Sequence, residues 1–528
     1  MTIKPSSILR FLLRPVFRLV IAAAIAFGSL FMLVALKPDT VEAASGGTDA
    51  AVRTAVAKLP AFVRKVMKRT GVPGVAVAVV HKDKLIYAEG FGVRSTRTGG
   101  AVTRDTVFQI ASVSKPLGST AVAAAISNGA LTWDTPVAPL LPGFSLADPS
   151  VSEAVTVGDL YAHRSGLPGE FGNDLEKFGF DRQYIFEHAD REPLAPFRTF
   201  YAYSNFGLTA GGVAAANATG RDWNALARDF LFAPLGMVRS TYSHEALKKM
   251  KNVASLHQRV NGRWVPGPKR NADAQAPAGG ANSTVMDLSR WIRLLLAGGV
   301  YEGRRIIERQ PLDDMLSIQI RTSGDGEGIA RGYGFGMEVS VEADGGVAWS
   351  HSGDFQRGAS TQVYLVPELE LGIVTLTNGW PVGVPQAINA TFVDWVSYGR
   401  STEDWLKVIG ALFAPYTTPT YEIDGQKRPR DPNSSGLLVG YAGSYESDYA
   451  GNAEVTVQRR QLVLALGPDG ATRIPLRHWD GDVFFYNALG LPDGFYTAVR
   501  FLRDGQGFVT SMTVDEVNSG LGRFARIP

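Results

Sequence analysis

The stretch "TVFQIASVSKPLGSTAVAAAISNGAL", residues 106–131, limits the possible folds of this chain more than any other segment. Its alanine-rich run predicts a buried helix from about Ser112 to Asn128, with Gly129 as the residue just past its end. Lys115 lies in the first turn of that helix, where burying an ammonium group is costly unless something compensates. Either Lys115 extends to the surface, or it has a chemical role beside Ser112.

Ser112 and Lys115 are three residues apart, so a helix places both side chains on one face. A serine hydroxyl is a weak nucleophile until a neighbouring base removes its proton. A buried lysine can be that base because burial lowers its pKa, and the helix N-terminus favours negative charge at Ser112. The alternative is a capping serine followed by a surface lysine. Ser114, equally close to Lys115, is interpreted as a bystander.

Two further short patterns each occur once in the chain. Tyr203-Ser204-Asn205 offers a phenol that can relay protons and an amide that can orient a substrate carbonyl or the lysine. His351-Ser352-Gly353 lies in a predicted strand, where glycine lets a bound acyl group approach the backbone. Alone, Tyr203 would be interpreted as a core tyrosine and His351 as a structural histidine. Together with the Ser-x-x-Lys pattern, they favour a catalytic site.

The hydrophobic periodicity predicts an α/β fold built on an antiparallel sheet. Residues 74–80 and 85–93 predict a β-hairpin, and strand patterns return in "GGVAWSHSG", "STQVYLVP" and "LGIVTLTNG", which together span 345–379. Between them lies a mostly helical inserted subdomain, and we expect the active site at the junction of the sheet and this subdomain.

Helices flank the predicted sheet. One spans 48–70, with a kink or break expected at Pro60, and another spans roughly 384–412. A third helix follows Thr284, which can serve as its N-cap with Asp287 at the third helical position.

The length of 528 residues predicts more than one domain. A hydrolase-like domain is expected over 46–413. A linker rich in proline, glycine, serine and charge is expected at 414–436. Residues 437–528 alternate apolar and polar in short runs, which predicts a small β-barrel, with a sandwich as the alternative.

The first 43 residues have the pattern of an export signal. Four basic residues precede an apolar run at 19–36, and Val41-Glu42-Ala43 places small residues where a signal peptidase cleaves. The run is also long enough to span a bilayer, so an uncleaved anchor in the inner membrane is the alternative. In both cases we expect the remainder of the chain in the periplasm or outside the cell.

Charge and cysteine content exclude several classes of function. The leader holds five Lys/Arg and two acidic residues, a net charge of +3; the whole chain is also +3, so the remainder is 3 − 3 = 0. No basic surface is left to bind nucleic acid. The absence of cysteine excludes disulfides and thiolate metal sites.

With these motifs, the chain resembles the serine β-lactamase-like family, which includes penicillin-recognising DD-peptidases, D-aminopeptidases, class C β-lactamases and related esterases. The resemblance covers about residues 50–400. It is carried by "FQIASVSKP", "DLYAHRSGLPGE", "PAGGANSTVMDLSRW" and "WSHSGDFQRGASTQVYLVPE". It implies that Ser112 is the acylated nucleophile, that Lys115 is its base, and that Tyr203 shuttles the proton to and from the leaving group.

The resemblance also assigns the remaining site residues. It implies that Asn205 contacts the substrate, that His351 lines the site from the sheet, and that Ser352 and Gly353 bind the substrate. The oxyanion hole would consist of the backbone N–H groups of Ser112 and Asp354, because donors must face the tetrahedral oxygen and a strand edge supplies one. The acyl-enzyme is then hydrolysed by water, with no cofactor and no metal.

One departure from the family pattern narrows the expected substrate. Class C β-lactamases usually have Lys-Thr-Gly where this chain has His351-Ser352-Gly353, and a histidine is charged only part of the time near neutral pH. We therefore expect a serine peptidase or amidase acting on short linear peptides, including ones with D- or other unusual residues. A carboxylesterase and a weak β-lactamase are the alternatives.

The C-terminal domain, with "YAGSYES" at 441–447, resembles the small barrel appended to some peptidases of this family. There it can cover the cleft or build oligomers, so a homo-oligomer is one expectation. A catalytically idle binding protein is the alternative from another class, and the intact Ser112, Lys115 and Tyr203 argue against it.

Other catalytic patterns have little support. No serine has glycines at both −2 and +2, which excludes the α/β-hydrolase nucleophile elbow. No closely spaced histidine pair suggests a zinc site. His163 is interpreted as a loop-packing residue, and "PAGGAN", which lacks the ending of a phosphate loop, as a turn lining the cleft.

Overall fold

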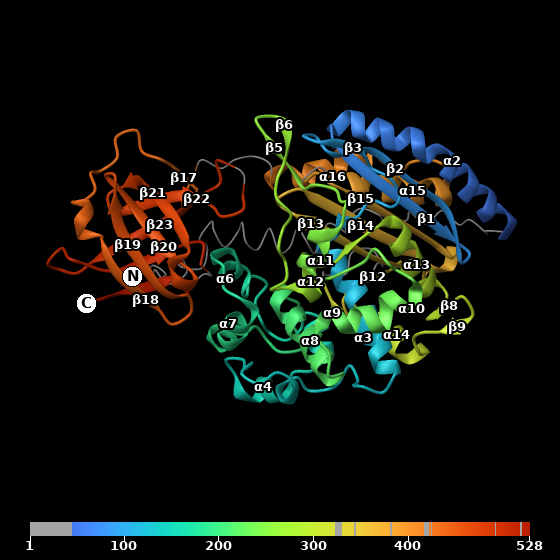
Figure 1. Cartoon of the computed structure of the whole chain (residues 1–528), viewed down its shortest axis with the longest axis horizontal. Coiled ribbons are helices and arrows are strands. Elements are labelled where there is room, and N and C mark those ends of the chain that lie inside the picture. The colour runs from blue at the N-terminus through green and yellow to red at the C-terminus, as the bar shows by residue number, and fades with distance from the viewer. Residues whose placement is uncertain are drawn as a thin grey trace, which may run out of the picture. The chain divides into compact units, whose positions relative to one another are not determined.

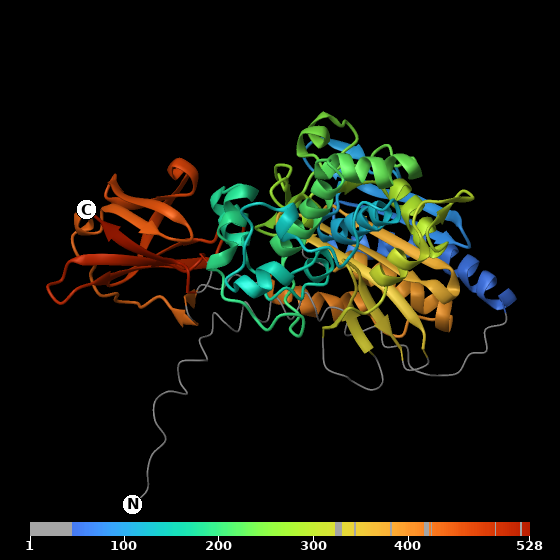
Figure 2. The ribbon, with the colours of Figure 1, turned by 90° about the horizontal axis from the view of Figure 1, so that it is seen from below.

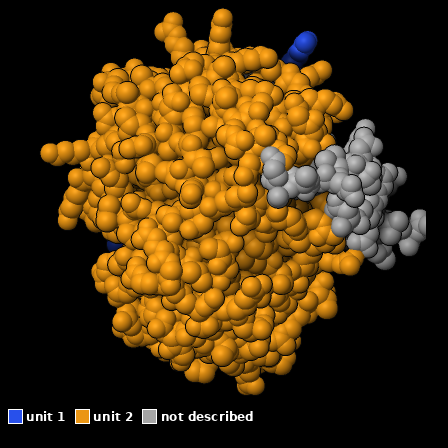
Figure 3. All heavy atoms as spheres, turned by 90° about the vertical axis from the view of Figure 1, so that its right-hand side faces the viewer, with its two compact units in different colours: residues 1–31, 174–180, 418–528 blue, residues 32–173, 181–417 orange. Residues whose placement is uncertain are grey.

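The structure is a computed structural model that describes residues 45–322, 330–342, 345–380, 383–416, 422–423, 425–491, 493–517 and 520–528. The predicted leader at 1–43 lies outside these residues. The described chain forms two compact units (Figure 1), and Figure 3 shows mainly unit 2. Unit 2 contains residues up to 173 and from 181 to 416, and unit 1 contains residues 174–180 and those from 422 onward. Among the described residues, no helix is long and apolar enough to cross a membrane.

A nine-stranded antiparallel sheet forms the centre of unit 2, with the order β10-β11-β12-β13-β14-β15-β1-β2-β3. The expected antiparallel α/β fold is confirmed. The pairing of β1 with β15 joins the N-terminal hairpin to strands nearly 300 residues later, with Val75 opposite Thr377. The strands are β1 (Gly74–His81), β2 (Lys84–Ser95), β3 (Gly99–Ala101), β10 (Ile320–Arg321), β11 (Ala330–Tyr333), β12 (Glu338–Val341), β13 (Val347–Phe355), β14 (Ala359–Val366) and β15 (Leu371–Thr377).

Helices α2 (Ser45–Thr70), α15 (Val384–Tyr398) and α16 (Trp405–Phe413) lie together on one side of this sheet (Figures 1 and 2). The prediction of a break at Pro60 was wrong, because α2 runs through that residue. A proline inside a helix costs about 3 kcal/mol. The buried apolar side chains of α2, such as Leu59 and Val63, offset that cost.

The predicted single helix over 384–412 was also wrong. Residues 384–413 form two helices, because Gly399 takes a left-handed conformation with φ of 72° and ends α15. Asp404 then caps α16 by accepting from the backbone N–H of Lys407.

The helical subdomain covers the opposite face of the sheet. Its central helix is α3 (Ser114–Ser127), in which residues 114–125 are all buried. This helix begins two residues after its predicted start at about Ser112, because residues 111–113 form a separate 3-10 turn. At α13 (Val285–Leu296) the predicted cap is present, since the Thr284 hydroxyl accepts from Asp287 N at 3.0 Å.

The other elements of this part of the chain are short. They are α4 (Pro149–Ala154), α5 (Val157–Tyr161), α6 (Asn173–Phe178), α7 (Arg182–Glu187), α8 (Asn205–Ala218), α9 (Trp223–Ala227), α10 (Ala233–Leu235), α11 (His244–Lys249), α12 (Ala276–Gly279), α14 (Arg309–Met315), β4 (Phe108–Gln109), β5 (His257–Val260), β6 (Arg263–Pro266), β7 (Asn282–Ser283), β8 (Val300–Tyr301) and β9 (Arg304–Arg305).

Unit 1 is a closed eight-stranded barrel, so the predicted barrel is confirmed over the sandwich. A two-stranded piece, β16 (Glu422–Ile423) and β17 (Gln426–Lys427), lies within the predicted linker, and Ile423 packs against Trp479 of the barrel. The barrel strands are β18 (Gly443–Ser447), β19 (Gly451–Gln458), β20 (Gln461–Leu466), β21 (Thr472–Asp480), β22 (Val483–Asn487), β23 (Tyr496–Arg503), β24 (Val509–Val514) and β25 (Arg523–Ile527).

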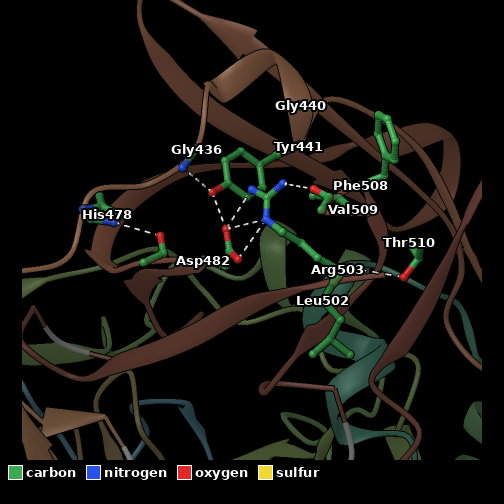
Figure 4. A network of polar contacts seen from close by, with 12 residues as sticks. Gly436, Gly440, Tyr441, His478, Asp482, Leu502, Arg503, Phe508, Val509 and Thr510 are labelled. Carbon is green, nitrogen blue, oxygen red and sulfur yellow. Dashed lines mark hydrogen bonds and ion pairs between the residues drawn. The ribbon is translucent and has the colours of Figure 1, made fainter. Parts of the chain in front are cut away.

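A polar network holds the segment that leads into the first barrel strand (Figure 4). The Arg503 guanidinium donates to both carboxylate oxygens of Asp482 at 2.9 to 3.1 Å, and the Tyr441 hydroxyl donates to the same carboxylate at 2.5 Å. Gly436 N donates to the Tyr441 hydroxyl at 2.9 Å. The network thereby ties residues 436–441 to the barrel wall.

Residues 174–180 belong to the barrel unit although they lie inside the hydrolase sequence. The Tyr449 hydroxyl donates to the Asp174 carboxylate at 3.1 Å, and the Thr472 hydroxyl donates to the backbone oxygen of Phe178 at 2.9 Å. Phe178 is fully buried. The barrel unit is therefore completed by a segment more than 200 residues upstream.

Candidate active site

Ser112 lies in the tight turn that precedes α3, and its side chain is half-buried. Ala111 has a φ of +48°, a left-handed conformation that non-glycine residues seldom adopt. The Ser114 hydroxyl stabilises this turn by donating to Ala111 O and accepting from Ala281 N. Ser114 thus shapes the turn and makes no contact with Lys115 through its hydroxyl.

Lys115 is fully buried, and its Nζ meets three oxygen atoms. They are the Ser112 hydroxyl at 3.2 Å, the Asn205 side-chain oxygen at 2.7 Å and the backbone oxygen of Ala278 at 3.0 Å. Of the two sequence-based alternatives for Lys115, the surface lysine is wrong. The side chain crosses the core to lie beside Ser112.

Burial lowers the pKa of Lys115 well below its ordinary value; the charge of Glu338 opposes this effect and that of Arg270 adds to it. A neutral amine has two N–H groups and one lone pair. With the Asn205 and Ala278 oxygens accepting the two N–H groups, the lone pair is left to face the Ser112 hydroxyl. This is the arrangement that a general base for Ser112 requires.

Tyr203 covers the other side of the lysine. Lys115 Nζ lies 4.5 Å from the centroid of the Tyr203 ring. Burial raises the pKa of Tyr203 above its ordinary value, against the effect of a hydrogen bond with Ser112, so the phenol keeps its proton at neutral pH. The phenol is a proton donor within reach of both groups.

His163 holds Tyr203 in place, which fits its predicted packing role. Its ring packs on the Tyr203 ring with 4.5 Å between centroids, and its Nδ1 accepts from Ser204 N at 3.0 Å. The Ser204 hydroxyl caps α8 by accepting from Gly207 N. The capped N-terminus of α8 and the His163 ring therefore fix the position of Tyr203.

Asn205 is the first residue of α8, and its two amide atoms face different partners. Its oxygen accepts from Lys115, while its Nδ2 donates to the Asn173 side-chain oxygen at 3.1 Å. Asn173 thus fixes the orientation of the Asn205 amide, and the Asn205 oxygen is directed at the lysine.

His351 reaches the ring cluster from β13. Its Nδ1 lies 2.6 Å from Ser352 O, which can only accept, so Nδ1 carries the proton. Its Nε2 then accepts from the Tyr333 hydroxyl at 2.8 Å. Burial, together with the charge of Lys115, lowers the pKa of His351 to about 3. His351 is a neutral imidazole.

Gly353 allows β13 to lie against the turn that carries the nucleophile. A Cβ at this position would lie 2.8 Å from Ser112 N and 2.7 Å from the Thr361 hydroxyl. Thr361 ties the two segments together by donating to Ile110 O at 2.8 Å and Gly353 O at 3.0 Å. The close approach leaves no room for any side chain at 353.

The edge of β13 beside Ser112 is open. Within the described residues, β12 pairs with β13 only as far as Ser350. Beyond it, residues 351–355 pair with β14 alone, so one backbone edge remains available for a substrate oxygen. This supports the predicted oxyanion hole at Ser112 N and Asp354 N.

The structure does not gather all predicted substrate-binding side chains around Ser112. The Ser352 hydroxyl accepts from Gln362 at 3.4 Å and from Gln386 of α15 at 3.3 Å. Its hydroxyl is therefore used on the α15 side of the sheet. The Asp354 carboxyl is buried, which raises its pKa to about 7 against the effect of the Ser360 hydroxyl.

Sequence reasoning missed Asn173, Tyr333 and Glu338 at this site. Ala278, whose backbone oxygen accepts from Lys115, lies in the "PAGGAN" segment that was predicted to line the cleft. Asn173 contacts the site through its amide and has no sequence signal of its own. Tyr333 and Glu338 flank "GFGM" at 334–337, where an aromatic and a carboxylate before a strand resemble an ordinary core and surface pair.

The chain is similar to known proteins over most of its length. Residues 59–394 match the family described as beta-lactamase, and residues 427–523 match a domain of unknown function. The chain is 33% identical over 319 residues to penicillin-binding protein 4 of Amycolatopsis lactamdurans, covering 58% of this chain and 81% of that protein. It is 26% identical over 330 residues to an unguisins hydrolase of Aspergillus campestris, covering 60% of each.

Among solved structures, the octameric penicillin-binding protein homologue from Pyrococcus abyssi is similar to this chain, with a TM-score of 0.57. The two are 22% identical, and the match covers 89% of this chain and all of that one. This likeness concerns the fold, including both the sheet-based part and the barrel.

Proposed function

The chain belongs to the beta-lactamase family of serine hydrolases, and we propose that it is a peptidase or amidase that hydrolyses short linear peptides through a Ser112 acyl-enzyme. One observation carries this proposal: the buried Lys115 amine lies 3.2 Å from the Ser112 hydroxyl while its two N–H groups have other acceptors.

In the acylation step, Ser112 Oγ attacks the scissile carbonyl carbon as Lys115 Nζ takes the hydroxyl proton. The carbonyl oxygen becomes an oxyanion, which the backbone N–H groups of Ser112 and Asp354 stabilise. Collapse of this intermediate breaks the C–N bond. The leaving amine takes a proton through Tyr203, whose phenol is replenished from Lys115.

In the deacylation step, water attacks the Ser112 ester. Its proton passes to the Lys115 and Tyr203 pair, the Ser112–carbonyl bond breaks, and the proton returns to Ser112 Oγ. Each turnover consumes one water and releases a carboxylic acid and an amine. No group other than these side chains and the backbone donors is needed.

The state of His351 supports a peptide over a β-lactam. A β-lactam carries a carboxylate close to its reactive bond, for which a cation is the best partner. His351 is neutral, with a pKa of about 3, and its Nε2 is already bonded to Tyr333. One similar protein is named for hydrolysis of unguisins and another for binding penicillin. We therefore propose peptide-like substrates first, and esters and cephalosporins as the alternative substrates.

Active-site labelling tests the nucleophile and base. A fluorophosphonate should label the wild-type protein at Ser112, and Ser112→Ala should abolish labelling. Lys115→Ala should slow labelling by several orders of magnitude, about a thousand-fold or more, because the other described group bonded to Ser112 is the Tyr203 phenol, whose raised pKa makes it a proton donor and not a base. Normal labelling of Lys115→Ala would remove lysine as the base.

A substrate panel tests the reaction class. The panel contains linear peptides and amino-acid anilides, each with D- and L-residues, and p-nitrophenyl esters. For each substrate, kcat/KM is divided by the rate constant of the uncatalysed reaction. We expect this ratio to be higher for the peptides and anilides than for the esters. A cephalosporin rate far above the peptide rate would overturn the assignment.

We also propose that the protein works outside the cytoplasm, as an exported or membrane-anchored enzyme, and that it assembles into homo-oligomers. The basic and apolar pattern of residues 1–43 supports export. N-terminal sequencing of the exported protein distinguishes a cleaved signal from an anchor, and light scattering gives the oligomeric state.

A further inference from the structure

Glu338, the first residue of β12, carries a carboxylate that the proposed reaction does not use. Its Oε2 is buried, and the carboxylate has no hydrogen bond or ion pair with any residue that the structure describes. A buried carboxylate oxygen without a partner is costly, so its presence requires an explanation such as a catalytic or binding role. Glu338 is therefore the strongest unexplained polar group near the site.

The strand register places Glu338 beside the catalytic rings. Glu338 lies directly opposite Tyr333 of β11, and its charge acts on Lys115, Tyr201 and Tyr203. Directly opposed residues in an antiparallel pair project their side chains from the same face of the sheet. The Tyr333 ring faces the site, because its hydroxyl donates to His351. The Glu338 side chain therefore projects from the same face of the sheet as the Tyr333 ring.

Aromatic rings surround this position. The centroid of Tyr333 lies 5.7 Å from that of Tyr201 and 6.2 Å from that of Tyr203. Tyr201 and Tyr203 are half-buried as whole residues, and burial of their phenol groups raises the pKa of both. The faces of such rings attract cations, most strongly where water is excluded.

Lys115 does not form an ion pair with Glu338. Its Nζ is already bonded to Ser112, Asn205 and Ala278. The two groups still sense each other's charge, since Glu338 acts to raise the pKa of Lys115 and Lys115 acts to lower that of Glu338. Burial raises the pKa of Glu338 well above its ordinary value, so the ionised carboxylate needs a second cation beside it.

We propose that Glu338, with the rings of Tyr201 and Tyr203, forms a subsite that binds a positively charged amino group of the substrate close to the scissile bond. This inference rests on the proposed peptidase or amidase function and adds a substrate class to it. The enzyme then prefers amino-acid or peptide substrates whose ammonium group lies near the carbonyl that Ser112 attacks.

The first test compares two substrates that differ in one group. Alanine p-nitroanilide, as both enantiomers, carries an ammonium group; isobutyric p-nitroanilide has a methyl group in its place. Wild type should prefer the better alanine enantiomer. Glu338→Gln should lower kcat/KM for that substrate about thirty-fold or more, because a buried charge loses its partner. The neutral substrate should change by less than about two-fold.

Two variants serve as controls. Glu302→Gln removes one negative charge at an exposed position between β8 and β9 and should leave both substrates unchanged. Glu338→Asp keeps the charge and should restore part of the preference for the ammonium substrate. A parallel loss of both substrates in Glu338→Gln would mean that Glu338 acts through Lys115, and an undiminished preference would mean that the ammonium binds elsewhere. Either result overturns the subsite.

The second test does not depend on turnover. Propylammonium ion should slow fluorophosphonate labelling of Ser112 in wild type, whereas 1-propanol at the same concentration should not. Glu338→Gln should lose this protection while still being labelled. Equal effects of the two compounds on wild type would overturn the subsite.

The labelling experiment also separates the two proposals. If Ser112 is not labelled at all, the proposed function fails. If Ser112 is labelled and alanine p-nitroanilide is hydrolysed without preference over its neutral counterpart, the function stands and only the ammonium subsite fails.

Discussion

At the scale of single residues, the site is governed by what burial does to proton affinities. Burial lowers the pKa of Lys115, which favours the neutral amine that can accept a proton; it also keeps His351 neutral and the Tyr203 phenol protonated. Each of these effects follows from removal of the group from water. The most testable consequence concerns Asp354, whose pKa lies within the range of ordinary assays.

Asp354 should set the alkaline limit of acylation. Burial raises the pKa of its carboxyl to about 7, so the group is neutral below that pH and ionised above it. Ionisation places a negative charge beside the backbone N–H that we assign to the oxyanion, which opposes the developing charge. The wild-type acylation rate should fall about ten-fold above pH 7, and Asp354→Asn should remove this fall.

Stopped-flow acylation between pH 5.5 and 9 measures this effect. Asp313→Asn in α14 is a suitable control, because it removes the same charge from an exposed side chain. If the alkaline limb persists in Asp354→Asn, another group is responsible for it.

His351 should make the protein sensitive to acid. Its folded pKa of about 3 lies below the ordinary 6.5, so the unfolded chain binds the proton first. The unfolding free energy then falls as pH drops below 6.5, by about 1.4 kcal/mol per pH unit, and His351 contributes nothing to this dependence above 6.5.

His351→Gln isolates that contribution. The difference in unfolding free energy between this variant and wild type should change by about 2–3 kcal/mol in favour of the variant between pH 7 and pH 4.5. Urea unfolding at the two pH values measures it, and the comparison cancels other buried histidines such as His163. A constant difference would mean that His351 is not buried as a neutral base.

At the scale of elements, catalysis depends on the contact between β13 and the turn before α3. Gly353→Ala should lower acylation about a hundred-fold or more, because the added methyl group meets Ser112 N and displaces the nucleophile. Gly410→Ala in α16 is the matched control, since nothing lies within 4 Å of its added methyl group. Near-normal labelling of Gly353→Ala would show that β13 can move without cost.

The sequence predicted elements whose signal is local. The β1–β2 hairpin, the Thr284 cap and the barrel follow from periodicity and capping chemistry within a few residues. The split between α15 and α16 was missed although Gly399 and the polar residues up to Asp404 interrupt the apolar pattern, which is the local signal of a helix end and a new N-cap. The continuous α2 was missed because tertiary burial outweighs the cost of Pro60.

The site residues that were predicted from the sequence also have a local signal. Ser112, Lys115, Tyr203 and His351 carry chemistry in their residue types, so short patterns could identify them. Ala278 contributes only its backbone oxygen, and Asn173 acts through another amide. Their roles depend on how distant segments pack, which no local pattern records.

At the scale of the whole molecule, the barrel unit depends on residues 174–180. Tyr449→Phe should weaken this connection, because it removes a hydroxyl that donates to the buried Asp174 carboxylate at 3.1 Å. A hydrogen bond to a charged group contributes about 1.5–3 kcal/mol. We expect faster limited proteolysis within 174–182 in this variant.

Tyr445→Phe is the control for that experiment. Its hydroxyl donates to Tyr441 O inside the barrel, so its loss should lower barrel stability without selectively exposing residues 174–182. Equal cleavage in both variants would mean that Tyr449 acts only through general barrel stability.

The placement of residues 174–180 also restricts how such a chain can be rearranged by recombination. A crossover in the region 414–436 would exchange the C-terminal strands and leave α6 behind with the old hydrolase. The incoming barrel would then need one hydroxyl for the Asp174 carboxylate and another for the backbone oxygen of Phe178, as Tyr449 and Thr472 provide here. The barrel and residues 174–180 therefore have to be inherited together, although they are far apart in the sequence.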